Sequence, residues 1–206
     1  MKELVIAAWD RDYSWVSLLN SDIKVTIYNK NIENLKENEI PISPNIGRDV
    51  HTFFYHIVKN YDNLSDYTFF SQDYPFDHVM NYFNIINDDV SNWERIAIQK
   101  SPGCWFFNSY YDVFTCDKNG NPHHSGLDIE LIWRQLFDYT IFDYIRFTVA
   151  GHFCISKECV HKHPINFYKK ILNILETNEQ APWIIERLEP YIFLDIIPKE
   201  CIKYND

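Results

Sequence analysis

The sequence predicts a single α/β domain with a mixed, mostly parallel sheet flanked by helices. Strand-like and helix-like segments alternate through the first hundred residues, as they do in parallel sheets. The first strand-like segment, residues 4–9, is apolar throughout, which is typical of a strand buried on both faces. With 206 residues and 46% hydrophobic composition, the chain can bury one substantial core.

Three predicted strands in the first half have a clear sequence pattern. Residues 4–9 form the first, residues 23–28 alternate and are rich in β-branched side chains, and residues 67–70 are again apolar. The other expectations for this half are a short helix at 13–19, a turn-rich segment at 29–43, a helix at 49–61, a helix at 77–86 and a short strand at 96–99. Asp49 is expected to cap the second of these helices.

The second half begins with a segment that looks irregular, residues 101–125, with a clear turn at 117–121. Two strand-rich pieces surround Ala150 and Gly151 within residues 145–155. Helices are expected at 128–137, 164–175 and 181–193, from the spacing of apolar side chains and from proline at or near two of the starts.

Charge and composition limit the partners. The net charge of −10 disfavours nucleic acid, because its phosphates would be repelled. It leaves room for a single nucleoside diphosphate held by a local arginine or a metal ion. No apolar run is long enough for a membrane span, so a cytoplasmic location is expected. The five cysteines form no CxxC pair and are expected to be reduced thiols.

An isolated carboxylate, Asp73, follows the strand at 67–70. Ligands of open α/β sheets bind at the carboxyl ends of the strands, so Asp73 is a candidate site residue. One helix earlier, Asn45, Gly47, Arg48 and Asp49 combine a flexible turn, a helix start and a guanidinium, which together suit a phosphate. A turn glycine and a surface ion pair would give the same residues a purely structural role.

Three blocks carry a resemblance to known proteins: residues 45–52 (NIGRDVHT), 71–78 (SQDYPFDH) and 182–191 (PWIIERLEPY). They resemble a family of unknown function with bacterial, fungal and large-DNA-virus members. One viral relative is the amino-terminal domain of a chlorovirus capsid-glycosylating protein. The order of segments is also similar to the nucleotide-binding half of small GT-A-type glycosyltransferases, which implies a GT-A-like (Rossmann-like) fold.

The resemblance implies a nucleotide-sugar donor, most simply a UDP-sugar, bound by residues 1–100, and a glycan or glycoprotein acceptor bound by residues 101–206. It implies Mn²⁺ or Mg²⁺ held by Asp73, with Trp9, Asp10 and Gln72 beside the nucleotide. The GT-A hallmark Asp-x-Asp is here Ser71-Gln72-Asp73, so one acid is missing. A Mg²⁺ site can still use a single protein carboxylate with phosphate and water oxygens.

Further candidates lie outside this acid. The resemblance places Glu186 as the base that deprotonates the acceptor hydroxyl. Alternatively, Glu186 is a surface residue that only pairs with Arg187. Asp77 is a second acid that could act on the acceptor or metal, or simply cap a helix. His152 could face the acceptor or complete the metal site. The aromatic side chains Trp105, Phe106, Phe107, Tyr110 and Tyr111 could stack on a sugar or form core.

The expected function is therefore glycosyl transfer from a nucleotide sugar to a hydroxyl group. Two alternatives remain open. The incomplete Asp-x-Asp is compatible with a catalytically degenerate nucleotide- or glycan-binding module. A metal-dependent nucleotide-sugar hydrolase would use the same residues without an acceptor.

Overall fold

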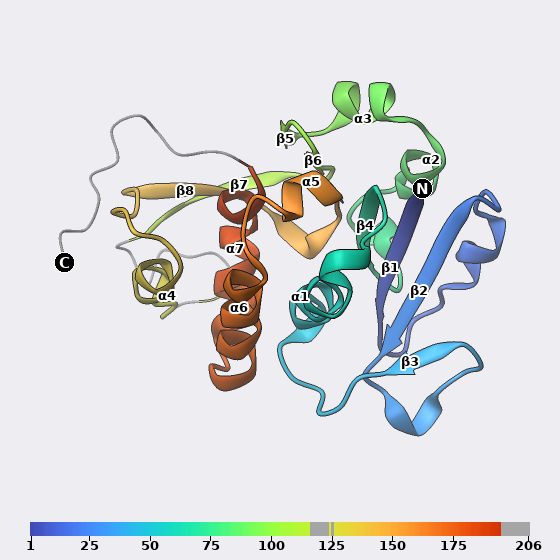
Figure 1. Ribbon diagram of the computed structural model, residues 1–206, viewed down its shortest axis with the longest axis horizontal. Helices are drawn as coiled ribbons and strands as arrows, with labels where there is room; N and C mark the ends of the chain where they lie inside the picture. The colour runs from blue at the N-terminus through green and yellow to red at the C-terminus, as the bar shows by residue number, and fades with distance from the viewer. Residues whose placement is uncertain (116–123, 125, 195–206) are drawn as a thin grey trace.

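A seven-stranded sheet in the order β3-β2-β1-β4-β9-β6-β5 forms the centre of the computed structural model (Figure 1). The structure describes residues 1–115, 124 and 126–194. Strand β1 (Lys2–Ala8) pairs in parallel with β2 (Ile23–Asn29) and β4 (Tyr67–Gln72), and β2 pairs in parallel with β3 (Glu39–Pro41). The carboxyl ends of these four strands therefore lie along one edge of the sheet.

The other half of the sheet is antiparallel. Strand β9 (Phe153–Ser156) pairs with β4 and with β6 (Cys104–Phe106), and β5 (Gln99–Ser101) follows at the edge. Strands β7 (Tyr110–Phe114) and β8 (Tyr144–Thr148) form a separate antiparallel pair. Because β6 runs in the direction of the four parallel strands, the sheet is mixed and mostly parallel, and the predicted Rossmann-like α/β class is confirmed.

Helices cover both faces of the sheet. Helix α1 (Arg48–Asn60) lies on one face, packed against α6 (Ile165–Thr177) and α7 (Ala181–Phe193), with α4 (Ile129–Leu136) beside the last two (Figure 1). The other face carries α2 (Tyr82–Asn87) and α3 (Val90–Ile96). The remaining short helices are η1 (Ser14–Leu18), η2 (Ile32–Asn34), η3 (Tyr61–Asn63), η4 (Pro75–Asp77), η5 (Val149–Gly151) and α5 (Lys157–Val160).

The continuous apolar character of the parallel strands follows from this arrangement. Neighbouring side chains of β1 point to opposite faces, so Val5 joins the core under α1 and Leu4 joins the core under α2 and α3. Phe70 and Phe69 of β4 divide in the same way. A strand that is buried on both sides shows no alternation in its sequence.

Several predicted elements need correction. Residues 77–86 do not form one helix: Pro75 starts the short turn η4, and α2 begins only at Tyr82. Asp49 is not the cap of α1, because Gly47 takes the N-cap position with a left-handed φ of 66°. Residues 101–125 are not irregular throughout, since they contain β6 and β7. The predicted turn at 117–121 lies outside the described residues.

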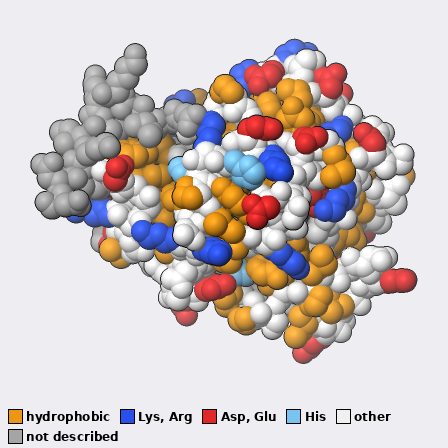
Figure 2. Space-filling view, in the orientation of Figure 1, with side chains coloured by type: hydrophobic (Ala, Val, Ile, Leu, Met, Phe, Trp, Pro, Cys, Tyr) orange, Lys and Arg blue, Asp and Glu red, His pale blue; other side chains and the backbone are white. Residues whose placement is uncertain are grey.

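Within the described residues, no helix is both long enough and apolar enough to cross a membrane. Figure 2 shows basic, acidic and hydrophobic side chains interspersed over the face in view. The described cysteines, Cys104, Cys154 and Cys159, are buried. A cytoplasmic location stays a prediction.

Candidate functional site

The site begins where the strand order changes direction. From β1 the sheet extends to β2 and β3 on one side and to β4 on the other, so the connections after β1 and β4 separate and leave a crevice. A cavity of about 360 Å³ lies there, and we call it the strand-end cavity. Its lining includes Trp9, Asp10, Arg11, Lys30, Asn45, Arg48, Asp49, Thr52, Gln72 and Asp73.

Asp73 lies in the wall of this cavity but is only 6% exposed. Its Oδ2 accepts the backbone N–H groups of Trp9 and Arg11, both at 3.0 Å, and its Oδ1 accepts the N–H of Tyr74 at 3.0 Å. The carboxylate thus ties the loop after β1 to the end of β4. The sequence pattern did not predict this structural role of Asp73.

The residues expected to help Asp73 hold a metal lie elsewhere. Asp77 forms an ion pair with Arg11 and lines neither of the cavities described here. His152 is fully buried and packs against the rings of His78 and Tyr82. Among the residues that the structure describes, no three His, Cys, Asp or Glu side chains are grouped so as to hold a metal ion. Asp77 and His152 therefore do not complete a ligand set with Asp73, and the Mn²⁺ or Mg²⁺ site stays a prediction that rests on Asp73.

The turn before α1 is strained. Gly47 and Arg48 have φ values of 66° and 54°, so both adopt the left-handed region. A Cβ at position 47 would lie 2.5 Å from Cβ of His51, which is why only glycine fits there. Arg48, unlike glycine, carries a Cβ, and a left-handed conformation at such a residue costs about 1–2 kcal/mol. Strain of this kind is concentrated at functional sites.

Lys30 holds this turn in place. It follows β2 directly, is only 7% exposed, and its Nζ donates to the carbonyl oxygens of Ile46 and Arg48. Burial lowers the pKa of the Lys30 ammonium to about 8, while the nearby charge of Asp49 opposes that shift. The ammonium remains mostly charged at neutral pH, so the strand-end cavity has a buried cation in its wall.

Polar groups without partners also border the strand-end cavity. Thr52 is fully buried, and its Oγ1 has no hydrogen-bond partner. Helix α1 has no side-chain cap, because its N-cap residue is glycine. The first N–H groups of a helix have no acceptor within the helix and carry a partial positive charge. The start of α1 is thus suited to an anionic oxygen.

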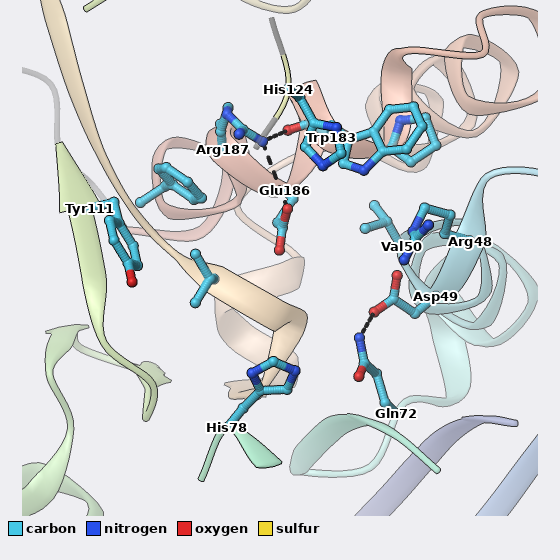
Figure 3. Close-up of a pocket in the computed structure, with 13 residues that line it drawn as sticks. Arg48, Asp49, Val50, Gln72, His78, Tyr111, His124, Trp183, Glu186 and Arg187 are labelled. Carbon is cyan, nitrogen blue, oxygen red and sulfur yellow. Dashed lines mark hydrogen bonds and ion pairs between the residues drawn. The ribbon is translucent and has the colours of Figure 1, made fainter. Parts of the chain in front are cut away.

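A second cavity of about 360 Å³ lies between α1, α7 and the β7–β8 pair, and we call it the α7 cavity (Figure 3). Arg48, Asp49 and Gln72 line both cavities, and Gln72 Nε2 donates to Asp49 Oδ2 at 2.7 Å in this shared wall. The rest of the lining comprises Val50, His78, Tyr111, His124, Phe147, Val149, Pro182, Trp183, Glu186 and Arg187.

Glu186 points from α7 into the α7 cavity, opposite Asp49 and Gln72 (Figure 3). Its Oε2 lies 3.8 Å from Nη1 of Arg187, which is itself only 2% exposed. Arg187 donates to the carbonyl oxygen of Trp183 at 2.7 Å and lies 4.7 Å from the ring centre of Phe147. Glu186 is therefore a carboxylate at the cavity surface with a buried arginine next to it.

One turn further along α7, Glu189 is fully buried, and neither of its carboxyl oxygens has a hydrogen-bond partner. Burial, together with the charges of Glu186 and Asp49, raises the pKa of Glu189 well above its usual value of 4.5. Burial thus favours the protonated form of the Glu189 carboxyl group.

His152 has a comparable environment. Both ring nitrogens are buried without partners, and burial, with a smaller effect from the charge of His78, lowers the pKa of His152 to about 3. His78 itself lines the α7 cavity. His152 supports the floor of the site without reaching the cavity surface.

The structure thus brings together most of the predicted nucleotide residues: Trp9, Asp10, Asn45, Arg48, Asp49, Gln72 and Asp73 all line the strand-end cavity. Gly47 lines neither cavity and acts by shaping the turn. The aromatic segment 105–107 is buried core, whereas Tyr111 reaches the α7 cavity. Residues 7–73 line the strand-end cavity, whereas the α7 cavity draws on both halves of the chain, and the division into a donor half and an acceptor half stays a prediction.

Sequence reasoning missed Lys30 and Thr52. Lys30 lies just after the predicted strand at 23–28, so the rule that singled out Asp73 would also have found it. Thr52 has no such signal, because its orphaned hydroxyl depends on the packing of α1 against the sheet.

A family model described as "Protein of unknown function (DUF3431)" matches residues 4–205. No curated protein and no solved structure matches the chain.

Proposed function

The chain belongs to the DUF3431 family, which is described only as of unknown function, and we propose that it transfers a sugar from a nucleoside diphosphate donor to a hydroxyl group of a glycan or glycoprotein. The observation that carries this proposal is the pair of adjoining cavities. The strand-end cavity lies at the switch point of a parallel sheet, and it shares Arg48, Asp49 and Gln72 with a cavity that contains Glu186.

The strand-end cavity suits the nucleotide. Trp9 is 47% exposed at its rim and offers a ring for a base, and Asp10 is an acceptor for base N–H or ribose hydroxyl groups. The cationic turn at Arg48 and the uncapped start of α1 suit the diphosphate. UDP-sugars are the first donors to test.

The α7 cavity suits the acceptor. Trp183, Tyr111 and Phe147 give it aromatic walls, which pack well against the C–H faces of sugar rings. Glu186 lies among them with its carboxylate toward the shared wall (Figure 3). In the proposed step, Glu186 takes the proton of the acceptor hydroxyl while the hydroxyl oxygen forms a bond to the anomeric carbon of the donor sugar. The bond from this carbon to the phosphate oxygen breaks, and its electron pair leaves with the nucleoside diphosphate.

The proposal is tested in two stages. A thermal-shift panel of nucleoside diphosphates and UDP- and GDP-sugars should reveal the donor, since a ligand at one hundred times its Kd adds about 2.7 kcal/mol of stability. The nucleotide released from that donor is then measured with and without glycan acceptors. Release that no acceptor redirects would indicate a hydrolase, and binding without release would indicate a degenerate binding module.

Glu186→Gln is the decisive variant. Loss of a general base lowers kcat by roughly 10²–10⁴-fold, and donor binding should be unchanged because Glu186 does not line the strand-end cavity. Glu179→Gln, an exposed glutamate just before α7, is the matched control and should keep full activity. Full transfer activity in Glu186→Gln would show that Glu186 is not the general base.

A further inference from the structure

The strand-end cavity has its own means of neutralising a diphosphate. The carboxylate that should hold a metal ion, Asp73, is committed to three backbone N–H groups. Three of the roughly four lone-pair sites of this carboxylate are then in use, which leaves about one for a cation. The positive charge for a diphosphate must therefore be sought among the other residues of the wall.

Lys30 is one source. An ammonium group has three N–H donors, and two of those of Lys30 go to the carbonyl oxygens of Ile46 and Arg48. The third donor is left for a ligand in the cavity that Lys30 lines. Because the side chain is held at both ends, it reaches this position without further loss of conformational freedom on binding.

Arg48 is the other source. Within the part of the chain that the structure describes, no carboxylate lies within ion-pair distance of its guanidinium, which lies 5.7 Å from the ring centre of Trp183. A planar guanidinium binds phosphate through two parallel N–H groups. Arg11 does not contribute in the same way, since it is already paired with Asp77.

The neutral donors complete this arrangement. The Thr52 hydroxyl is buried, unpartnered and in the cavity lining, and it lies in the second turn of α1, above the uncapped N–H groups of the first turn. A buried hydroxyl without a partner is costly, and a phosphate oxygen would satisfy it. The two cationic side chains, the start of α1 and the Thr52 hydroxyl thus all border the strand-end cavity.

We propose that the strand-end cavity binds the diphosphate of its nucleotide through Lys30, Arg48, Thr52 and the start of α1, with no divalent metal ion. This inference rests on the proposed function, because it names how the donor of that reaction is held. When the sugar leaves, the charge on the departing diphosphate is balanced by Lys30 and Arg48.

The test is isothermal titration of the whole protein with UDP and with GDP, once in excess EDTA and once in Mn²⁺. The nucleotide that binds should do so in EDTA with an affinity within about threefold of that in Mn²⁺. Lys30→Met and Arg48→Gln should each weaken binding by about 10- to 100-fold, which is the usual effect of losing a charged hydrogen bond.

Two controls match these variants. Lys2→Met removes a lysine that, like Lys30, donates to backbone carbonyl oxygens, but at the end of α2. Arg95→Gln removes an exposed arginine on α3. Both controls should bind as the wild type does. If Lys30→Met does not fold, Arg48→Gln and the EDTA arm still decide, because the Arg48 side chain is exposed.

Each outcome has a distinct meaning. Binding that requires Mn²⁺ and is lost in Asp73→Asn would overturn the metal-free site and leave the proposed function intact. Unchanged binding in both Lys30→Met and Arg48→Gln would also overturn it. No binding of UDP or GDP with or without Mn²⁺ would contradict the donor assignment in the proposed function itself.

Discussion

Substitutions of Arg48 can distinguish the energetic cost of its left-handed backbone conformation from the contribution of its guanidinium to nucleotide binding. Arg48 has a φ of 54°, which costs about 1–2 kcal/mol for a residue with a Cβ and nothing for glycine. Glycine in turn gains about 0.4–1 kcal/mol of freedom in the unfolded chain. Arg48→Gly should therefore be more stable than Arg48→Ala by about 1 kcal/mol, or roughly 2–4 °C in Tm for a chain of this size.

Both variants lose the guanidinium, so both should bind the nucleotide equally weakly. Urea unfolding gives the stabilities and titration gives the affinities. Lys169, which is exposed in the middle of helix α6, is the matched control, because glycine in a helix interior is about 1 kcal/mol less stable than alanine and the order should reverse. If Arg48→Ala is as stable as Arg48→Gly, the strain assigned to this turn does not exist.

Two buried ionisable groups predict opposite pH effects. The pKa of His152 is lowered to about 3, so the unfolded state binds the proton first and stability falls as the pH drops below 6.5, by up to about 1.4 kcal/mol per pH unit. His152→Phe should flatten this acid limb in urea unfolding between about pH 4 and pH 7; an unchanged limb would place the acid sensitivity elsewhere. The pKa of Glu189 is raised above 4.5, so the wild type loses stability as the pH rises above that value. The stability advantage of Glu189→Gln should grow by about 1.4 kcal/mol per pH unit until the folded-state pKa is reached, and an advantage independent of pH would refute the buried neutral carboxyl.

Elements with a strong periodicity were predictable from the sequence. Helices α1, α4 and α6 have amphipathic faces, α7 has closely spaced apolar residues, and β1, β2 and β4 are apolar or β-branched segments of ordinary length. Strands β3 and β5 have three residues each at the two edges of the sheet, so they are too short to show a pattern. The predicted helix at 77–86 fails because η4 intervenes, and a proline start does not reveal whether a helix continues.

The location of the site could be predicted from the sequence, but the roles of its residues could not. The carboxyl ends of parallel strands meet at one edge, so the positions of Asp10 and Asp73 follow from topology. What Asp73 does could not be predicted, because two of its three partners belong to a loop more than sixty residues earlier in the chain. The burial of Glu189 and His152 likewise depends on packing from distant segments.

The most direct test of the central claim is a crystal structure of the protein soaked with the nucleotide sugar that the thermal-shift panel selects. We expect the diphosphate between Lys30 and Arg48 at the start of α1, with the sugar directed toward Glu186. Nucleotide bound at another place, or an empty strand-end cavity at a concentration that saturates the protein in solution, would contradict it.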